Sequence, residues 1–592
     1  MANVITTDGT TVYQLKKWLG LNESPDGDTG LKLGEAAQMR NFRVTRENHL
    51  QIRPGYAAVC TLSENAPVRG LWCGYVAGTL HLLCACGGHL WDVDRESRQN
   101  TDLGEIGDAE TFFFGFSQKV YLLTGSEYYR WDGTGGAAVV EGYVPIVTTA
   151  TPPAGGGTLL ERVNNLTGKR RARYSPDGTS TVFRLAETAI DEVVSVEGTG
   201  IAWTADTEAG TVTFASAPAK GVNTVTITWR KGNGRREKVT AMRWAEFYNG
   251  ATDARVFLYG DGTNEAVYSD LDQEGQPSAE YFPDLNVMAV DTANTPITAM
   301  IRHYDRLLVF KSDAAYTAQY DALELSDGTV TAAFYTTPLN RGLGCAAPGQ
   351  ARLVQNYPRT LFGRSVYSWA LAAGATRDER NARRISDRVE TTLAGFDLAD
   401  CVTFDDERRQ EYYVCCGDRA LVHNYGNDAW YYYDHFPARR MVDVEGDLYF
   451  GTEDGTLMHF ARQYRNDGLE PIDAYWESGS LDFERDWRRK YSAEIWVTIK
   501  PESQGRLTVT AQSDRKSEYV KKEAAAGLAT LTNADFAHWS FRTNRKPRVQ
   551  RVRLKVRKFI FYKLILSSRS ASAAATVLGA DFRVRYAGNV RN

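Results

Sequence analysis

At 592 residues the chain is well beyond the length of one ordinary core, so several domains are expected. Aromatic residues make up 11% of the chain and there are 52 glycines, which favours short strands and tight turns over long helices. No apolar run approaches the ~20 residues needed to cross a bilayer, and the N-terminus lacks the basic start and apolar centre of a signal peptide. We therefore expect neither a membrane-spanning segment nor export by that route.

A hairpin is predicted near the N-terminus, within Asn41–Val59. Two strand-like runs, FRVT and LQIRPGYAAV, are separated by RENH, in which Asn48 tolerates the positive φ that a tight turn needs. The second run contains a corner at Pro54-Gly55. We expect this hairpin to order the N-terminal strand onto a ring of β-sheets, with Pro54-Gly55 fixing the corner.

A weakly repeated unit then runs along the chain: an apolar strand, a turn rich in Gly, Asp or Ser, and a second strand that ends near an aromatic residue. Apart from one interruption, successive copies begin roughly 40 to 50 residues apart, which is the period of a four-stranded propeller blade. The repeat predicts an all-β protein with a β-propeller of six to eight blades, seven favoured; unrelated hairpins in β-sandwiches are the alternative. Seven copies begin at Gly78, Ser117, Ala254, Asp305, Pro358, Arg408 and Gly446.

The repeat is interrupted after its second copy. From Tyr174 to Arg230 apolar residues recur at a period near two, which predicts an inserted β-sandwich of immunoglobulin-like size. From Ala474 onward, six strand signals predict a C-terminal β-sandwich or jelly-roll domain. The predicted domains are an N-terminal segment with the first blades (1–165), the inserted sandwich (166–233), the remaining blades (234–470) and a basic C-terminal sandwich (471–592).

Basic residues gather in the C-terminal domain. From Leu481 to the end there are 24 Lys and Arg against 10 Asp and Glu, whereas the rest of the chain has a net charge of −18. In RVRLKVRKF cations alternate with apolar residues, so one strand would carry them on one face about 6.6 Å apart. Such a face could dock on an acidic protein surface, stay solvated or follow a phosphate backbone, in that order of preference. The residues predicted for partner docking are Arg542, Arg545, Lys546, Arg548, Arg551, Arg553, Lys555 and Arg557.

Sequence motifs for catalysis, metal binding and cofactor binding are not found. The adjacent Asp405 and Asp406 could flank a glycosidic bond, but a solvated turn between two strands is the preferred interpretation. The aromatic run WYYYDHF, Trp430–Phe436, could stack on sugars or bases, but a strand packed into the propeller is preferred. We therefore expect no enzymatic activity, no metal and no cofactor.

The eight cysteines lie mostly inside apolar strand-like runs. Their scattered positions do not form a disulfide framework, so buried free thiols are favoured over disulfides. Free thiols in turn indicate a reducing compartment.

Several ordered motifs resemble a family of tail and prophage proteins of tailed bacteriophages. Leu21–Tyr56 carries a Gly-Glu-Ala segment, an Arg-Asn-Phe strand and an Arg-Pro-Gly corner in the order found in that family. LERVNNLTGKRRARYSPDG from Leu160 is similar to the start of the inserted domain of these proteins. Further similar segments are YDRLLVFKSDAAYTAQYD from Tyr304, RGLGCAAPGQARLVQN from Arg341 and ARRISDRVETTL from Ala382. Together the motifs cover most of residues 20 to 470.

The resemblance is to the nozzle, or hub, proteins of short-tailed phages. It implies a virion protein made in the host bacterial cytoplasm, with a propeller that assembles as a ring, expected to be a hexamer, below the portal and adaptor proteins. Tail fibre, spike or needle proteins are further implied partners, and double-stranded DNA would pass through the lumen without specific binding. An acidic body suits such a conduit because it repels the phosphate backbone. A receptor protein that binds host glycans, or a propeller glycosidase or lyase, are the alternatives.

Overall fold

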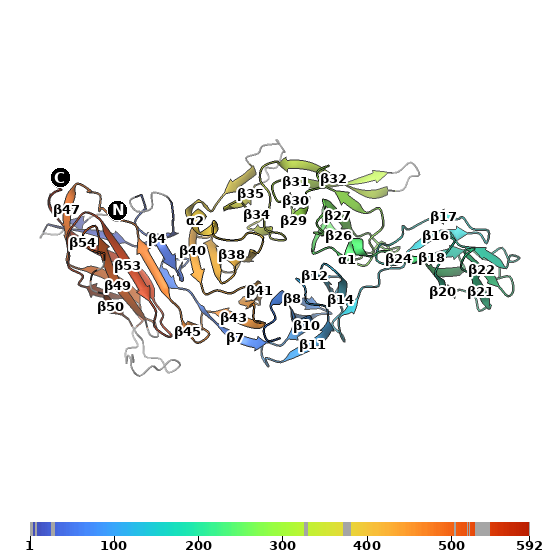
Figure 1. Ribbon diagram of the computed structural model, residues 1–592, viewed down its shortest axis with the longest axis horizontal. Helices are drawn as coiled ribbons and strands as arrows, with labels where there is room; N and C mark the ends of the chain where they lie inside the picture. The colour runs from blue at the N-terminus through green and yellow to red at the C-terminus, as the bar shows by residue number, and fades with distance from the viewer. Residues whose placement is uncertain are drawn as a thin grey trace. The chain divides into compact units, whose positions relative to one another are not determined.

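The chain is almost entirely β in its computed structural model, which describes residues 4–5, 9–24, 30–324, 330–370, 381–502, 505–517, 519, 521–526 and 545–590 (Figure 1). In these residues the helical elements are short: α1 (Glu237–Thr240), α2 (Glu390–Leu393) and the 3-10 turn η2 (Asp387–Val389). None of the described helices is long and apolar enough to cross a membrane. The all-β prediction is confirmed. The chain forms two compact units, unit 1 (Met1–Leu71, Arg95–Gln99 and Arg352–Asn592) and unit 2 (Trp72–Asp94 and Asn100–Ala351).

Unit 1 contains a β-sandwich built from both ends of the chain. Rings from its two sheets meet in the core, where Tyr562 and Phe582 have centroids 5.8 Å apart and Trp18 meets Trp476 edge-on at 4.8 Å. The nine-stranded sheet contains β1 (Val4–Ile5), β2 (Thr10–Leu15), β5 (Phe42–Val44), β6 (Leu50–Ile52), β47 (Arg488–Ser492), β48 (Ile495–Lys500), β51 (Arg548–Val552), β52 (Val556–Phe559) and β54 (Thr576–Asn589). The six-stranded sheet contains β3 (Gly20–Leu21), β4 (Glu35–Arg40), β46 (Ala474–Ser478), β53 (Tyr562–Ser568), β49 (Arg506–Ser513) and β50 (Lys522–Ala525).

The N-terminal strands therefore belong to the sandwich, which corrects the predicted domain boundaries 1–165 and 471–592. β2 pairs along Ala580–Arg585 of β54, and β4 pairs with β46. Figure 1 shows the blue N-terminal strand β4 among the orange and red C-terminal strands. These pairings join residues more than 400 positions apart, and each strand alone carries no signal for its distant partner.

The remainder of unit 1 holds three sheets that follow one another in the chain, except that the last also contains the N-terminal strand β7 (Gly55–Thr61), which pairs antiparallel with β43 and in parallel with β44. This pairing occurs after the Pro54-Gly55 corner, whereas the hairpin β5–β6 itself lies in the sandwich. That the hairpin orders the N-terminal strand onto a ring stays a prediction. The sheets contain β33 (Arg352–Val354), β34 (Tyr357–Phe362), β35 (Ser365–Trp369) and β36 (Ala382–Arg384); β37 (Val402–Asp406), β38 (Glu411–Cys416), β39 (Arg419–Asn424) and β40 (Ala429–Asp434); and β41 (Arg440–Val444), β42 (Asp447–Gly451), β43 (Thr456–Ala461), β7 (Gly55–Thr61), β44 (Asn466–Asp467) and β45 (Glu470–Pro471).

Unit 2 contains four further four-stranded sheets, whose strands are neighbours in chain order. They contain β8 (Val68–Val76), β9 (Thr79–Cys86), β10 (His89–Val93) and β11 (Asn100–Glu105); β12 (Phe112–Phe116), β13 (Lys119–Leu123), β14 (Tyr128–Trp131) and β15 (Ala138–Val139); β25 (Trp244–Asn249), β26 (Thr252–Tyr259), β27 (Glu265–Tyr268) and β28 (Val287–Ala289); and β29 (Ile297–His303), β30 (Arg306–Lys311), β31 (Ala315–Glu324) and β32 (Val330–Asn340). Buried aromatic and aliphatic side chains, such as Phe114 and Leu258, pack between neighbouring sheets.

Each of the seven predicted hairpins occurs as the second and third strands of one of these sheets, from β9–β10 to β42–β43. The turn residue Asn48 of the N-terminal hairpin has the expected positive φ, at 60°. The closing of the sheets into one propeller ring stays a prediction. None of the eight cysteines, all of which lie in the described residues, forms a disulfide, and six of them are buried.

The insert in unit 2 has its own core, in which Phe183, Phe214 and Trp229 are buried. It begins earlier than the predicted boundary 166, because β16 pairs in parallel with β18. Its five-stranded sheet contains β17 (Thr158–Leu159), β16 (Ile146–Thr151), β18 (Lys169–Tyr174), β23 (Val225–Arg230) and β20 (Glu192–Glu197), and its three-stranded sheet contains β19 (Val182–Arg184), β22 (Thr211–Phe214) and β21 (Trp203–Asp206). β24 (Gly232–Arg235) follows β23.

Replacement of Gly55 by alanine should destabilise unit 1, because a Cβ at this position would lie 2.0 Å from the carbonyl oxygen of Asn466. Overpacking of this kind costs about 1–3 kcal/mol. Gly200→Ala is the matched control, since a Cβ there meets nothing within 4 Å. Thermal denaturation followed by circular dichroism should show a lower melting temperature for Gly55→Ala only; equal melting temperatures would contradict the close approach.

Candidate functional site

A buried arginine joins the sandwich to the neighbouring sheets of unit 1. Arg53, in the Arg-Pro-Gly corner, donates to Asn41 Oδ1 at 2.8 Å and to the backbone carbonyl of Asp434 at 3.0 Å. Its guanidinium pairs with both carboxylate oxygens of Asp467, at 2.8 and 2.5 Å, and lies over the ring of Tyr433. The side chains of Arg53 and Asp467 are 0% and 7% exposed. We call the contacts of Arg53 and Asn41 the joint.

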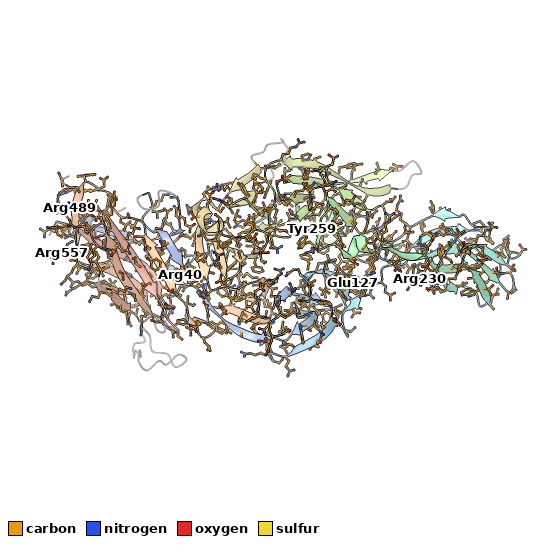
Figure 2. The ribbon with its side chains drawn as sticks, viewed as in Figure 1. Arg40, Glu127, Arg230, Tyr259, Arg489 and Arg557 are labelled. Carbon is orange, nitrogen blue, oxygen red and sulfur yellow. The ribbon has the colours of Figure 1, made fainter. Side chains whose placement is uncertain are left out.

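Asn41, in the Arg-Asn-Phe motif, forms the other half of the joint. Its backbone has a φ of 56°, a conformation that asparagine tolerates better than most residues. Its side chain accepts from the backbone N–H of Asp434 and donates to the carbonyl of Asp473, at 2.9 Å each. The adjacent Arg40, labelled in Figure 2, forms an ion pair with Asp473 at 2.7 Å. The two motifs therefore meet in space although they lie on different strands.

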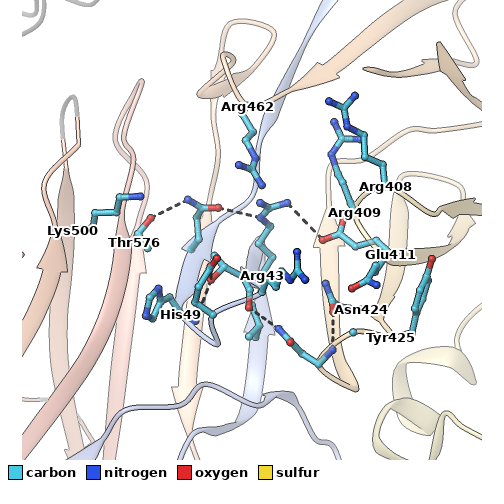
Figure 3. A pocket seen from close by; sticks show the side chains of 18 of the residues that line it. Arg43, His49, Arg408, Arg409, Glu411, Asn424, Tyr425, Arg462, Lys500 and Thr576 are labelled. Carbon is cyan, nitrogen blue, oxygen red and sulfur yellow. Dashed lines mark hydrogen bonds and ion pairs between the residues drawn. The ribbon is translucent and has the colours of Figure 1, made fainter. Parts of the chain in front are cut away.

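Beside the joint, unit 1 encloses an open cavity of about 1440 Å³ (Figure 3). One side comes from the sandwich, through the turn between β5 and β6, the end of β48 and part of β54. The other side comes from the turns that connect the strands of the sheets β37–β40 and β41–β43. Seven Lys and Arg residues line the cavity against four Asp and Glu, so its charge is positive.

A series of polar contacts crosses the cavity and pairs one of its cations, Arg43, with a carboxylate. Gln51 donates to Thr576 Oγ1 at 2.9 Å and accepts from Arg43 Nε at 3.2 Å. Arg43 in turn lies 3.6 Å from Glu411 Oε1, and both side chains are almost fully buried. Burial lowers the pKa of the Arg43 guanidinium, but the Glu411 carboxylate and nearby tyrosine hydroxyls outweigh burial, so that the pKa is raised. Arg43 is therefore a fixed positive charge behind the cavity wall.

Four exposed cations of the cavity have no such partner. Within the described residues no hydrogen bond or ion pair is formed by the side chains of Arg46, Arg462, Lys500 or Arg545, whereas Arg409 forms an ion pair with Asp406 at 2.6 Å. The positive charge of Arg43, then burial and the charge of Arg409, lower the pKa of Arg462. An anion in the cavity would relieve this repulsion. Of the residues that the structure describes, no group of three or more His, Cys, Asp or Glu is placed to hold a metal ion.

The residues predicted for partner docking divide between the cavity and the sandwich surface. Arg545 lines the cavity, Lys546 lies exposed beside it, and Arg542 lies outside the described residues. Arg551 forms an ion pair with the buried Glu494, and Arg548 is half-buried. Arg553, Lys555 and Arg557 are exposed. Figure 2 shows Arg557 beside Arg489 of the neighbouring strand β47.

The predicted single strand of evenly spaced cations is corrected by the structure. The expected alternation holds, because Val552, Leu554 and Val556 are buried between exposed cations. However, β51 ends at Val552 and pairs with β48, whereas β52 begins at Val556 and pairs with β47. Lys555 has a φ of 54°, which breaks the strand at the change of partner. The docking role of these residues stays a prediction.

The cavity cations contributed by turns were missed in the sequence. Arg408 and Arg409 follow the acidic pair after Glu407, and Arg43 and Arg46 lie within the predicted hairpin, but none of them belongs to a long basic run. The recurrence of arginine at Arg40, Arg43 and Arg46, in and after the Arg-Asn-Phe motif, was the one signal for these cations in the sequence. The fold brings these residues to Lys500 and Arg545, which come from distant parts of the chain.

The acidic pair does not lie in a solvated turn as predicted. Asp405 and Asp406 are in β37, where successive side chains point to opposite faces of the sheet, so the two carboxylates cannot act on one bond together. Asp406 is 2% exposed. Burial raises the pKa of Asp405 to about 6, although the Tyr425 hydroxyl and the charge of Arg359 act in the opposite direction. The aromatic run is largely buried, at Trp430, Tyr431, Tyr433 and Phe436; that its strand packs into a propeller stays a prediction.

No protein-family model matches the chain, and no curated protein matches it. Among solved structures, that of exo-β-1,3-galactanase from Phanerochaete chrysosporium with galactose matches at 9% identity and a TM-score of 0.19. The match covers 90% of this chain and 100% of that chain. A likeness this weak carries no argument about substrate or activity.

The expectation of no enzymatic activity is withdrawn, because the structure that matches is that of an enzyme; the likeness assigns no activity to this chain. The expectation rested on missing sequence motifs, and such motifs are a poor test in an all-β chain. Catalytic carboxylates can come from distant strands and leave no local pattern.

Replacement of Arg53 by methionine should destabilise unit 1 by about 3–5 kcal/mol, because it leaves the buried carboxylate of Asp467 without its partner. The double variant Arg53→Met/Asp467→Leu should recover much of the loss, since an apolar pair replaces a buried ion pair at little cost. Urea denaturation followed by tryptophan fluorescence measures both, with the exposed Arg569→Met as control. A double variant as unstable as Arg53→Met would show that the pair is not the source of the effect.

Replacement of Asp405 by asparagine should stabilise the protein at pH 7.5 and have little effect near pH 4. The pKa of Asp405 in the folded chain is about 6 and its ordinary value is 3.8, so the folded state holds the proton more tightly. The stability that the protonated Asp405 carboxyl contributes is present below pH 4 and is lost as the pH rises through 6. Melting temperatures at both pH values, with the exposed Asp418→Asn as control, measure the effect; a difference independent of pH would contradict it.

Proposed function

We propose that the chain is a structural protein of a bacteriophage tail, of the nozzle or hub type. In this proposal six copies assemble as a ring below the portal and adaptor proteins, and DNA leaves the virion through the ring. The starting point is the order of the motifs that resemble this family.

The observation that carries the proposal is the place of the motif residues in the fold. Asn41 and Arg53, from the Arg-Asn-Phe and Arg-Pro-Gly motifs, form the joint. Asn164, from the motif that opens the insert, is 1% exposed and donates to the carbonyls of Tyr143 and Glu280 at 2.8 Å each. Each of these residues holds two parts of the chain together. The resemblance therefore concerns residues that determine architecture, which supports a shared architecture more strongly than composition would.

Charge and sheet organisation also suit the proposal. Six sheets of four strands in chain order, and a seventh in which the N-terminal strand β7 joins β41–β43, are of the kind from which propellers are built. Outside the C-terminal region the chain carries an excess of 18 negative charges, which disfavours tight binding of the phosphate backbone. A conduit needs this weak binding because the genome has to move through it.

Negative-stain imaging with light scattering on the purified chain tests the proposal. The expected result is a six-fold ring with an axial hole wide enough for duplex DNA, at about six times the chain mass of 65.9 kDa. A chain that stays monomeric at high concentration and binds host polysaccharide saturably would overturn the ring and favour a receptor protein.

A further inference from the structure

Two strands of unit 2 run on beyond their neighbour β30 and form an arm whose outer part is exposed. At its base Phe334 packs against Tyr248 and Tyr320, and the Tyr248 hydroxyl accepts from the backbone N–H of Tyr320. β30 pairs with β31 as far as Ala318, whereas β31 and β32 stay paired to Glu324 and Val330 (Figure 1). We call residues 319–324 and 330–335 the arm. All six residues of 319–324 are exposed. At ~3.3 Å per residue the arm extends for roughly 20 Å.

The surface of the arm is suited to contact with another polypeptide. A two-stranded ribbon is marginally stable in water on its own, and its unpaired edges favour association. Leu323 and Tyr335 are 44% and 51% exposed. Residues 315–340 contain three acidic residues and no Lys or Arg. Two of the acidic residues, Asp321 and Glu324, are described, and neither forms an ion pair with a described residue.

The cavity of unit 1 has the complementary properties. Its volume of about 1440 Å³ exceeds the ~300–1,000 Å³ typical of pockets for small molecules, so a polypeptide segment suits it better than a single small anion. Arg462 and Lys500 also line a smaller hollow of about 290 Å³ next to Gln51 and Pro54. The unpaired cations therefore extend beyond one pocket.

We propose that the acidic arm of one copy of the chain binds in the basic cavity of a second copy, with Asp321 and Glu324 facing Arg462 and Lys500. Each copy carries both surfaces, so the contact is head-to-tail, and contacts of this kind close into a ring when the rotation between copies allows. The inference deepens the proposed ring and rests on it, because it assigns the surfaces through which the copies meet.

Charge reversal on each surface, followed by mixing, tests the contact. The arm variant is Asp321→Lys/Glu324→Lys and the cavity variant is Arg462→Glu/Lys500→Glu. Each variant alone places like charges opposite one another, so the protein concentration for half-assembly should rise at least tenfold in sedimentation velocity runs. An equimolar mixture should assemble again, because each altered surface then meets one of opposite charge. Lys220→Glu/Arg235→Glu, which changes two exposed cations of the insert, is the control.

The outcomes separate this contact from the ring itself. If the wild type forms a ring and both variants form the same ring, the arm contact is overturned and the proposed ring stands. Variants that dissociate but do not reassemble on mixing overturn the pairing of arm with cavity. If the wild type forms open oligomers, and the two variants assemble only when mixed, the contact is supported and the ring is not. A wild-type chain that stays monomeric overturns both. Melting temperatures equal to that of the wild type establish that each variant is folded.

Discussion

The arrangement of unit 1 depends on the burial of one guanidinium, that of Arg53. A buried arginine is tolerated only when its N–H groups find acceptors and its charge finds a partner. Arg53 finds them on three segments at once: Asn41 of the N-terminal strands, the end of β40, and Asp467 of β44. The direction of the sandwich relative to the sheets β37–β40 and β41–β45 follows from this requirement.

The electrostatic character of the cavity is a consequence of the same arrangement. The joint brings the turn between β5 and β6 toward the turns of the neighbouring sheets, and each turn brings arginines with it. The buried carboxylates Glu411 and Asp406 are already used by Arg43 and Arg409. The cations nearer to solvent form no ion pair with a described carboxylate, although Glu47, Glu407 and Asp447 also line the cavity, and a net positive surface remains. A surface of this kind is complementary to an acidic partner.

Local features of the sequence predicted local structure well. The seven hairpins occur where alternating apolar residues and turn residues indicate them, and Asn48 has the positive φ that its turn requires. The alternation of Val552, Leu554 and Val556 with exposed cations also holds. These patterns reflect the period of a strand and the preferences of turn residues, which depend on neighbours in the chain. The ends of the sandwich domain were predicted wrongly because β2 and β4 pair with strands at the other end of the chain.

Sequence alone thus specified the all-β character, the positions of the hairpins and the excess of basic residues at the C-terminus. Tertiary structure decided which strands complete the sandwich, that Arg53 is buried, and that Arg43, Arg462, Lys500 and Arg545 surround one cavity. The physical reason is the range of the interactions. Hydrophobic alternation and turn preference act between residues a few positions apart, whereas the pairing of strands and the sharing of a buried charge join residues hundreds of positions apart and leave no mark on the local pattern.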